Sequence, residues 1–254
     1  MKVKSRQDKI IAVVRKHQQL TIEELSSSLA SSKETIRRDV AELAKLGNVQ
    51  KFHGGVMLPN TYADDSFRSR MSTNASIKSM IANTAINHFS ENETLFIVTG
   101  STTLYFAELL YKLDNLTIVT NSGEIAKASS SKQSSNRVFL LGGEYNSSNN
   151  QTIGTMVATQ CRSFRAHHTI LTIGAMDEVT GAMQYSIDEA QIASAMIDRS
   201  QKVTVLVDSS KFGKLASFEV CSLEKIDRII CDTPPKGSLK SALENNAVEI
   251  IVAD

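Results

Sequence analysis

The chain has 254 residues, of which 41% are apolar and 22% charged, and a formal net charge of +1. No apolar run approaches the roughly 20 residues that cross a bilayer, which excludes a membrane-spanning chain, and the net charge alone indicates no class of partner. The charges are unevenly distributed, however: residues 1–58 hold 11 Lys and Arg against 6 Asp and Glu, the remainder 17 against 21, a balance that favours nucleic acid or membrane contact through the basic N-terminal segment.

Two short helices are predicted at the start of the chain. Between Arg6 and Lys16, isoleucines and valines recur at helical spacing, which is typical of an amphipathic helix. The segment "LTIEELSSSLA" follows, where Thr21 and Glu24 have the spacing of a capping box that begins a second helix.

A third helix is predicted over "SSKETIRRDVAELAKLG". Ser31 and Glu34 have capping-box spacing at its start, and Gly47 suits its end because glycine tolerates positive φ. Its apolar stripe predicts one buried face, formed by Ile36, Val40 and Leu43.

The stripe places Arg38 on the solvent side, with Lys33 and Arg37 on one flank. On this helix alone two readings stay open. The arginines form a solvated ladder of ion pairs, in which Glu34 and Glu42 lie four residues to either side of Arg38, or they form a surface for an acidic partner. We expect Asp39 to hold a neighbouring arginine or to cap local backbone.

The order of these elements favours the second reading. A short helix, a tight turn and a basic amphipathic helix make a helix-turn-helix, and "NVQKFHGGVM" suits a hairpin wing beside it. The string "SSKETIRRDVAELAKLGNVQKFHGGV" resembles the signature of the DeoR family of bacterial transcriptional regulators. The resemblance implies contact with double-stranded operator DNA, for which we expect these residues: Thr21, Ser32, Lys33, Thr35, Arg37, Arg38, Lys51 and His53.

Beyond a polar stretch, the chain alternates apolar β-prone runs with helical ones. The runs "TLFIV", "LTIVT", "RVFLL", "TILTIGA", "KVTVLVD" and "RIICD" predict an α/β domain with a mostly parallel sheet covered by helices. We therefore predict a winged helix-turn-helix over residues 3–58, a linker over 59–75 and a sensor domain over 76–254.

Small polar residues and glycine follow several of these strands. They form "TGSTT" from Thr99, "TNSG" from Thr120, "LGGEY" from Leu141 and "VDSSKFGK", which carries Asp208 and Lys211. Each alone is ordinary turn chemistry. Because the carboxyl ends of parallel strands share one edge of the sheet, four together predict a pocket for a small anionic ligand.

The same strings, with "DEA", run in the order of the DeoR-type sensor domain, which is similar in fold to ribose-5-phosphate isomerase and coenzyme A transferases. The resemblance implies a phosphorylated sugar or polyol as effector. We expect the ligand site to include both Gly143 and Asp208. By the same resemblance, a phosphate would lie on Gly100, Ser101, Thr102 and Thr103, and the ligand would also contact Asn121, Glu189 and Lys211. Arg70, Asn74 and Lys78 match a further family pattern, R-x-x-x-N-x-x-x-K.

The chain departs from the family at three places. Val98 stands where an aspartate is usual, Ala193 and Ser194 replace a basic pair, and His167 replaces an aspartate before the fourth core strand. Loss of an acid and of a lysine would change the ligand or weaken its binding. A metal pair of His167 and His168 is disfavoured, because adjacent strand residues point to opposite faces.

These patterns predict a DNA-binding regulator, by family default a repressor of a carbohydrate-utilisation operon, acting as a homodimer or homotetramer. One alternative is an isomerase-like sugar-phosphate enzyme with a DNA tether, with Glu189 as the candidate base. Another is a regulator with a decayed pocket that a protein partner controls. We predict no catalytic residues, no cofactor and no metal.

Three cysteines, Cys161, Cys221 and Cys231, cannot all pair and lack metal-ligand spacing. Reduced thiols, together with an N-terminus that lacks an apolar signal-peptide region, predict a cytoplasmic protein.

Overall fold

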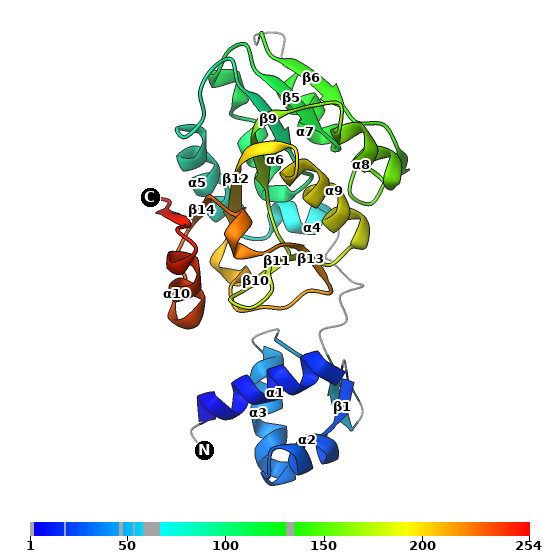
Figure 1. Ribbon diagram of the computed structural model, residues 1–254, viewed down its shortest axis with the longest axis vertical. Coiled ribbons are helices and arrows are strands. Elements are labelled where there is room, and N and C mark those ends of the chain that lie inside the picture. The colour runs from blue at the N-terminus through cyan, green and yellow to red at the C-terminus, as the bar shows by residue number, and fades with distance from the viewer. Residues whose placement is uncertain (1–2, 18, 46–47, 53, 58–66, 131–134) are drawn as a thin grey trace.

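The computed structural model describes residues 3–17, 19–45, 48–52, 54–57, 67–130 and 135–254. Gly47, His53 and residues 59–66 of the expected linker lie outside these residues. Figure 1 shows an N-terminal head and a larger sensor body. Within the described ranges, no helix is long and apolar enough to cross a membrane.

The head is a winged helix-turn-helix, as predicted. Its elements are α1 (Val3–His17), β1 (Gln19–Thr21), α2 (Ile22–Ser28), α3 (Lys33–Lys45), β2 (Gln50–Phe52) and β3 (Gly55–Met57). The wing hairpin β2–β3 is antiparallel, and β1 pairs with the other edge of β3. The predicted stripe of α3 is buried in a small apolar core with Leu25 of α2 and Ile10 and Val14 of α1.

The sensor body is built on a seven-stranded parallel sheet. The sheet has the order β15-β14-β12-β9-β4-β5-β6, and every neighbouring pair is parallel. Its strands are β4 (Thr94–Ile97), β5 (Thr117–Thr120), β6 (Arg137–Leu140), β9 (Ala166–Leu171), β12 (Ser200–Val207), β14 (Arg228–Cys231) and β15 (Glu249–Val252).

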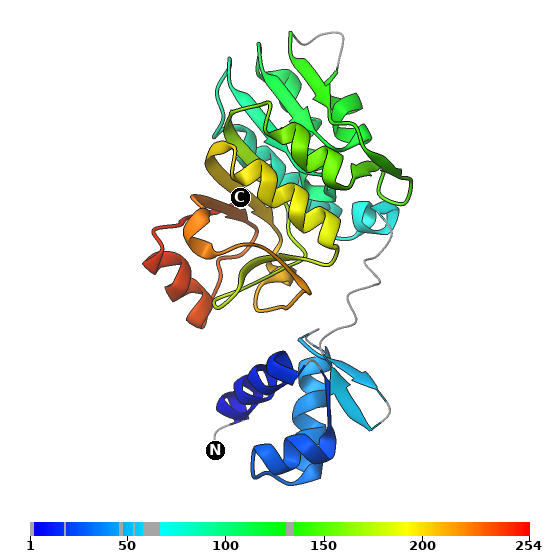
Figure 2. The same cartoon turned by 45° about the vertical axis from the view of Figure 1, so that its right-hand side comes forward.

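Helices cover both faces of this sheet, as its apolar strands predict. Leu95 and Ile97 of β4 face a core with α5, α6 and α7, whereas Phe96 between them faces a second core with α8, α9 and α10. Figure 2 shows α5 and α9 on opposite sides of the sheet. The helices are α4 (Phe67–Ser72), α5 (Ala75–Ile86), α6 (Ser101–Ala107), α7 (Gly123–Ser129), α8 (Thr155–Cys161), α9 (Ile187–Ile197) and α10 (Gly237–Asn245), with 3₁₀ turns at Leu110–Lys112, Ser209–Lys211 and Leu223–Lys225.

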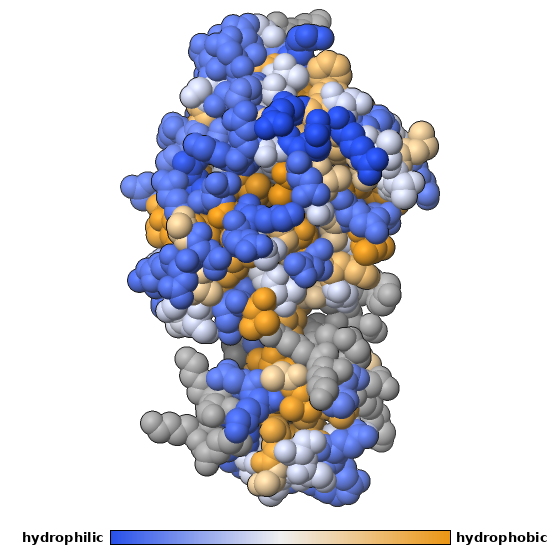
Figure 3. All heavy atoms as spheres, in the orientation of Figure 1, coloured by the Kyte–Doolittle hydropathy of each residue, from blue (hydrophilic) through white to orange (hydrophobic). Residues whose placement is uncertain are grey.

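Two small antiparallel units were not anticipated from the sequence. One is the hairpin of β7 (Glu144–Asn146) and β8 (Gln151–Ile153), and the other a sheet of β10 (Ala175–Asp177), β11 (Gly181–Gln184) and β13 (Phe218–Cys221). Helix α4 also falls inside the range expected to be linker. Figure 3 shows a mostly hydrophilic surface on the sensor body, with apolar residues in smaller patches between.

Candidate functional site: a basic helix and a polar cavity

Helix α3 presents its basic residues to solvent. Ile36, buried with Val40 and Leu43, fixes the inner face, so Arg37 and Arg38 are exposed. Of the other residues predicted to meet DNA, Thr21, Ser32, Lys33 and Lys51 are exposed, Thr35 is half-buried, and His53 lies outside the described residues. The head therefore offers hydroxyls and cations on α3, at its N-terminal turn and on the wing.

One prediction for α3 needs correction. The cap is Ser32, not Ser31: the Ser32 Oγ accepts a hydrogen bond from the Thr35 N–H at 3.2 Å. Ser31 belongs to the preceding turn instead, since its N–H donates to the Ser26 carbonyl at 3.1 Å and its carbonyl accepts from the Ser26 Oγ at 2.6 Å. By contrast, the capping box at Thr21 and Glu24 is confirmed.

The alternative reading of a ladder through Arg38 is not supported, because Glu34 and Glu42 have other partners among the described contacts. Arg37 lies 3.7 Å from Glu34, and the Gln7 amide donates to Glu42 at 2.8 Å. These exposed contacts are weak, so Arg38 remains on the surface among the residues that the structure describes, where a phosphate or a base could meet it.

Asp39 serves the head's interior. Its side chain is only 3% exposed, and it accepts hydrogen bonds from the Nε and, at 3.2 Å, the Nη2 of Arg6 on α1. The carboxylate also raises the pKa of Arg6, chiefly through its hydrogen bond. Asp39 does hold an arginine, as expected, but one that lies 33 residues earlier in the chain, which ties α1 to α3.

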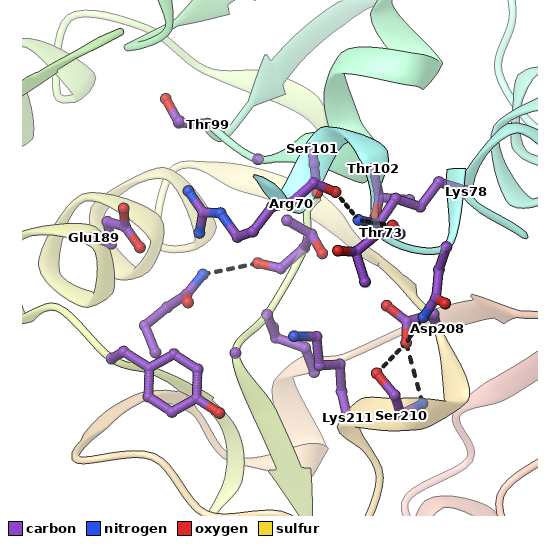
Figure 4. Close-up of a pocket in the computed structure, with 17 residues that line it drawn as sticks. Arg70, Thr73, Lys78, Thr99, Ser101, Thr102, Glu189, Asp208, Ser210 and Lys211 are labelled. Atoms are coloured by element: carbon purple, nitrogen blue, oxygen red, sulfur yellow. Dashed lines mark hydrogen bonds between the residues drawn. The ribbon is translucent and has the colours of Figure 1, made fainter. Parts of the chain in front are cut away.

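A polar cavity lies where the sensor strands end. Its volume is about 90 Å³, room for several waters or a small phosphate ester. Figure 4 shows the lining side chains, which come from α4, α5, the loops after β4, β9 and β12, and the start of α9. Eight predicted ligand residues line it: Arg70, Lys78, Gly100, Ser101, Thr102, Glu189, Asp208 and Lys211.

The loop before α6 brings backbone close to this cavity. Gly100 is the N-cap of α6, and it has no side chain that could accept from the N–H groups of the first turn. A Cβ there would meet the Thr172 Cγ2 at 2.1 Å, so only glycine fits against the neighbouring strand. Thr103 turns inward and donates to the Val98 carbonyl at 2.8 Å, which fixes the loop from behind.

Three cationic side chains line the cavity, those of Arg70, Lys78 and Lys211. Lys78 is 5% exposed and donates to the carbonyls of Arg70 and, at 2.8 Å, Thr73, so it holds the turn between α4 and α5. Lys211 follows β12 and lines the cavity directly. Burial and the Lys211 charge also lower the pKa of Lys214. Cations that line a cavity suit an anionic ligand.

Two carboxylates line the same cavity. Asp208 is 4% exposed and accepts from the Ser210 N–H at 3.1 Å and from the Ser210 Oγ. Glu189, on the first turn of α9, accepts through its Oε1 from the Asn149 amide at 3.0 Å and the Gln151 amide at 2.9 Å. Carboxylates that line a cavity can accept hydrogen bonds from the hydroxyls of a sugar or polyol.

Three predicted ligand residues lie behind the cavity wall. Besides Thr103, Asn121 is 1% exposed and accepts from the Thr99 N–H at 3.2 Å, which positions the loop. At Gly143, a Cβ would lie 2.6 Å from both the Ile153 carbonyl oxygen and the Val157 Cγ2, so this glycine packs the β7–β8 hairpin against α8.

The structure adds lining residues that the sequence did not single out: Thr73, Asn74, Thr99, Thr172, Ile173, Gly174, Gln184, Tyr185 and Ser210. Thr99 and Ser210 lie inside strings already noted, and Asn74 inside the pattern shared with the family. Thr172 to Gly174 follow β9 and could have been found by the same strand-end rule. Gln184 ends the antiparallel strand β11 and Tyr185 follows it, and that rule does not apply to such a strand.

The departures from the family lie away from the cavity. Val98 and Ala193 are buried in the apolar core between the sheet and α9, and neither lines the cavity. His167 is exposed at the start of β9, where its Nδ1 accepts from the Thr94 N–H at 2.9 Å, at the edge of the sheet opposite the ligand loops. The expectation that these substitutions reach the ligand directly therefore has no support in the described contacts.

Comparisons with known proteins place both halves of the chain. The family model described as "DeoR-like helix-turn-helix domain" matches residues 6–62, and "DeoR C terminal sensor domain" matches residues 73–233. The "Glycerol-3-phosphate regulon repressor" of Escherichia coli (strain K12) is 31% identical over 98% of this chain and 99% of its own. The "HTH-type transcriptional repressor CsqR" of the same organism is 26% identical, over 97% and 94%, and the "Transcriptional repressor AccR" of Agrobacterium fabrum 28% identical, over 98% and 97%.

Solved structures align less closely. Ribose 5-phosphate isomerase A from Methanocaldococcus jannaschii gives a TM-score of 0.41 at 17% identity, over 56% of each chain. The eIF2B beta structure from Chaetomium thermophilum gives 0.45 at 13% identity, over 90% of this chain and 85% of its own. No part of the function follows from similarities of this size.

Proposed function

Because this chain belongs to the DeoR family of transcriptional regulators, we propose that it represses a carbohydrate-utilisation operon and that a phosphorylated sugar or polyol controls it. The observation that supports an effector of this class is the chemistry of the cavity lining. Arg70, Lys78 and Lys211 are cations that line the cavity, while Glu189 and Asp208 supply hydrogen-bond acceptors. A phosphate ester with free hydroxyls has the chemistry that matches both groups.

Control of DNA binding follows from differential affinity. If the ester binds one arrangement of the molecule more tightly than another, it shifts the population toward that arrangement and changes affinity for the operator. Helix α4, which carries Arg70 into the cavity, is the first described element after the head. The ligand therefore reaches the segment of the sensor nearest in sequence to the DNA-binding residues.

Pairing of heads is the second part of the proposal. Helix-turn-helix proteins read half-sites about one helical turn apart, so two copies are needed for a palindromic operator. We expect a homodimer or homotetramer acting in the cytoplasm, where the DNA is. Light scattering during gel filtration of the full-length protein measures this, and a monomer at operator-binding concentrations would contradict it.

The effector is tested by thermal shift and the regulator by footprinting. We expect at least one of glycerol 3-phosphate, ribose 5-phosphate, glucose 6-phosphate and fructose 6-phosphate to raise the melting temperature by several degrees at a hundred times its Kd. The free sugar or glycerol at equal concentration is the control. Footprinting then scans the DNA upstream of the protein's own gene and its neighbours. If none of the four esters raises the melting temperature, the proposed effector class is wrong. If footprinting finds no protected site, the proposed role as a DNA-binding regulator is wrong.

We infer that the cavity binds its ligand without turnover, as the names of the relatives suggest. Glu189 accepts hydrogen bonds from two amides and Asp208 from Ser210, and we expect both carboxylates to serve as further acceptors for ligand hydroxyls. Incubation of the same four esters with micromolar protein should leave them unchanged by NMR. Isomerised product above the no-protein control would favour the enzyme alternative.

A further inference from the structure

The β7–β8 hairpin closes one side of the cavity with amides. Asn149, in the turn between its strands, and Gln151, at the start of β8, both donate to the Oε1 of Glu189 on α9, at 3.0 Å and 2.9 Å. Gln151 is 2% exposed, so its bond is shielded from water. The hairpin therefore sets the direction in which the Glu189 carboxylate points.

Asn149 also contacts the positively charged Arg70. Its Oδ1 accepts from the Nη2 of Arg70 on α4 at 3.0 Å, while its amide nitrogen faces Glu189. Only this orientation of the amide satisfies a guanidinium on one side and a carboxylate on the other, because a guanidinium only donates and a carboxylate only accepts. Figure 4 shows the Arg70 guanidinium directed to the side of the cavity where Glu189 lies.

Gln151 connects the same carboxylate to the loop before α6. The Asn121 amide donates to the Gln151 Oε1 at 3.3 Å, and the Asn121 Oδ1 accepts from the Thr99 N–H at 3.2 Å and the Thr99 Oγ1 at 3.1 Å. One hydrogen-bonded chain thus runs from α4 through the hairpin and α9 to the loop at Gly100. Arg70 and Glu189 are thereby held in one relative arrangement.

We propose that Asn149 is a positioning residue that sets the effector specificity of this cavity, an inference that rests on the proposed function. By accepting from Arg70 and donating to Glu189, it keeps the cation available to a phosphate and the carboxylate available to a hydroxyl of the same molecule. The selected ligand is a phosphate ester with at least one free hydroxyl within reach of Glu189. Inorganic phosphate lacks the part that Asn149 helps to select.

The discriminating variant is Asn149→Asp, which has the same shape. It keeps an acceptor for Arg70 and places a carboxylate against Glu189, which repels that side chain from its position. Asn150→Gly is the matched control, because Asn150 has a φ of +50°, which glycine adopts freely, and its amide lies toward Glu124 at 3.4 Å instead. Asn149→Ala, which removes the bridge without adding charge, serves if the aspartate variant does not fold.

The experiment compares thermal shifts of full-length protein with inorganic phosphate and with the four esters named above. We expect Asn149→Asp to lose at least tenfold in affinity for the ester that shifts the wild type most, while its response to inorganic phosphate stays within about twofold. Asn150→Gly should match the wild type with both probes.

Two results would overturn the inference alone. In one, Asn149→Asp binds the ester as tightly as a responding wild type does. In the other, it loses the ester and inorganic phosphate in equal proportion, as a general structural role would require. A wild type that responds to none of the esters overturns the proposed effector, and this inference with it.

Discussion

Two neighbouring residues on α3, Arg38 and Asp39, have different roles. Asp39 is buried and binds Arg6 of α1, whereas the neighbouring Arg38 is exposed. A buried carboxylate that holds two helices together contributes to folding, and an exposed arginine on a helix-turn-helix contributes to binding. Substitutions at these adjacent positions should therefore separate the two properties.

We expect Arg38→Ala to weaken binding to the operator, by about 1–3 kcal/mol where it reads a base and less where it meets a phosphate. Its melting temperature should stay within a degree of the wild type. Fluorescence anisotropy at several salt concentrations measures the change, and a phosphate contact also lowers the salt slope by about 1. Asp39→Asn is the comparison and should lower the melting temperature of the head first. If Arg38→Ala binds every DNA tested with unchanged affinity, Arg38 does not contact DNA and belongs to a solvated face of α3.

The three cysteines provide a second prediction at this scale. All are buried, and burial raises the pKa of Cys161 and Cys231 to about 11 and that of Cys221 to about 12. Because the thiolate is the reactive form, native protein should react slowly with a disulfide reagent at pH 8 and faster as the pH rises toward 11. Absorbance of the released thiol measures the rate, with urea-unfolded protein as the control. Equal rates in both states would contradict the burial.

Elements differ in how far the sequence could predict them. The inner strands of the large sheet are apolar runs packed between two layers of helices, so their identity and the clustering of loops at their ends were predictable. The edge strands β6 and β15 are partly exposed, and β15 was not predicted. The β7–β8 hairpin was not, because its strands are three residues long and polar. The role of Asn149 could not be predicted either, because its two partners, Arg70 and Glu189, lie 79 and 40 residues away in the sequence. Likewise, neighbouring serines offer the same cap chemistry to α3, and only the preceding turn decides for Ser32.

At the loop before α6, Gly100→Ala should abolish the response to the ester. Its Cβ would lie 2.1 Å from the Thr172 Cγ2, and overpacking of this kind costs about 1–3 kcal/mol of stability. Thr172→Ser removes that methyl group, so the double variant should recover most of both losses. Chemical denaturation and thermal shift measure them. A single variant that responds normally would show that the loop moves to admit a Cβ and is not held by this contact.

At the scale of the whole molecule, the head carries a charge of +5 and the remainder −4, so the field favours DNA at the head and disfavours it at the sensor. Effector and operator therefore meet separate surfaces of one chain, and any influence between them must pass through its conformation. Such a coupling is reciprocal for binding free energies.

We expect the factor by which the ester weakens operator binding to equal the factor by which operator DNA weakens ester binding, typically 5–150-fold. Titration calorimetry of the ester with and without a saturating operator duplex gives one factor, and anisotropy with and without the ester gives the other. A non-operator duplex is the control. Unequal factors would mean that the ester acts on some species other than the folded regulator bound at its operator.

The position of β4 has a consequence for how each new molecule is made. β4 is the first strand of the large sheet in the chain, yet it lies inside that sheet and pairs with β9, Leu95 opposite His168. The last strand of the head ends at Met57, whereas the last strand of the large sheet ends at Val252. At ribosomal rates, the roughly 195 residues between these points take on the order of 10–40 s to synthesise. During that interval the DNA-binding residues are already synthesised while the sheet that carries the ligand loops is incomplete, so we expect no effector to act on them.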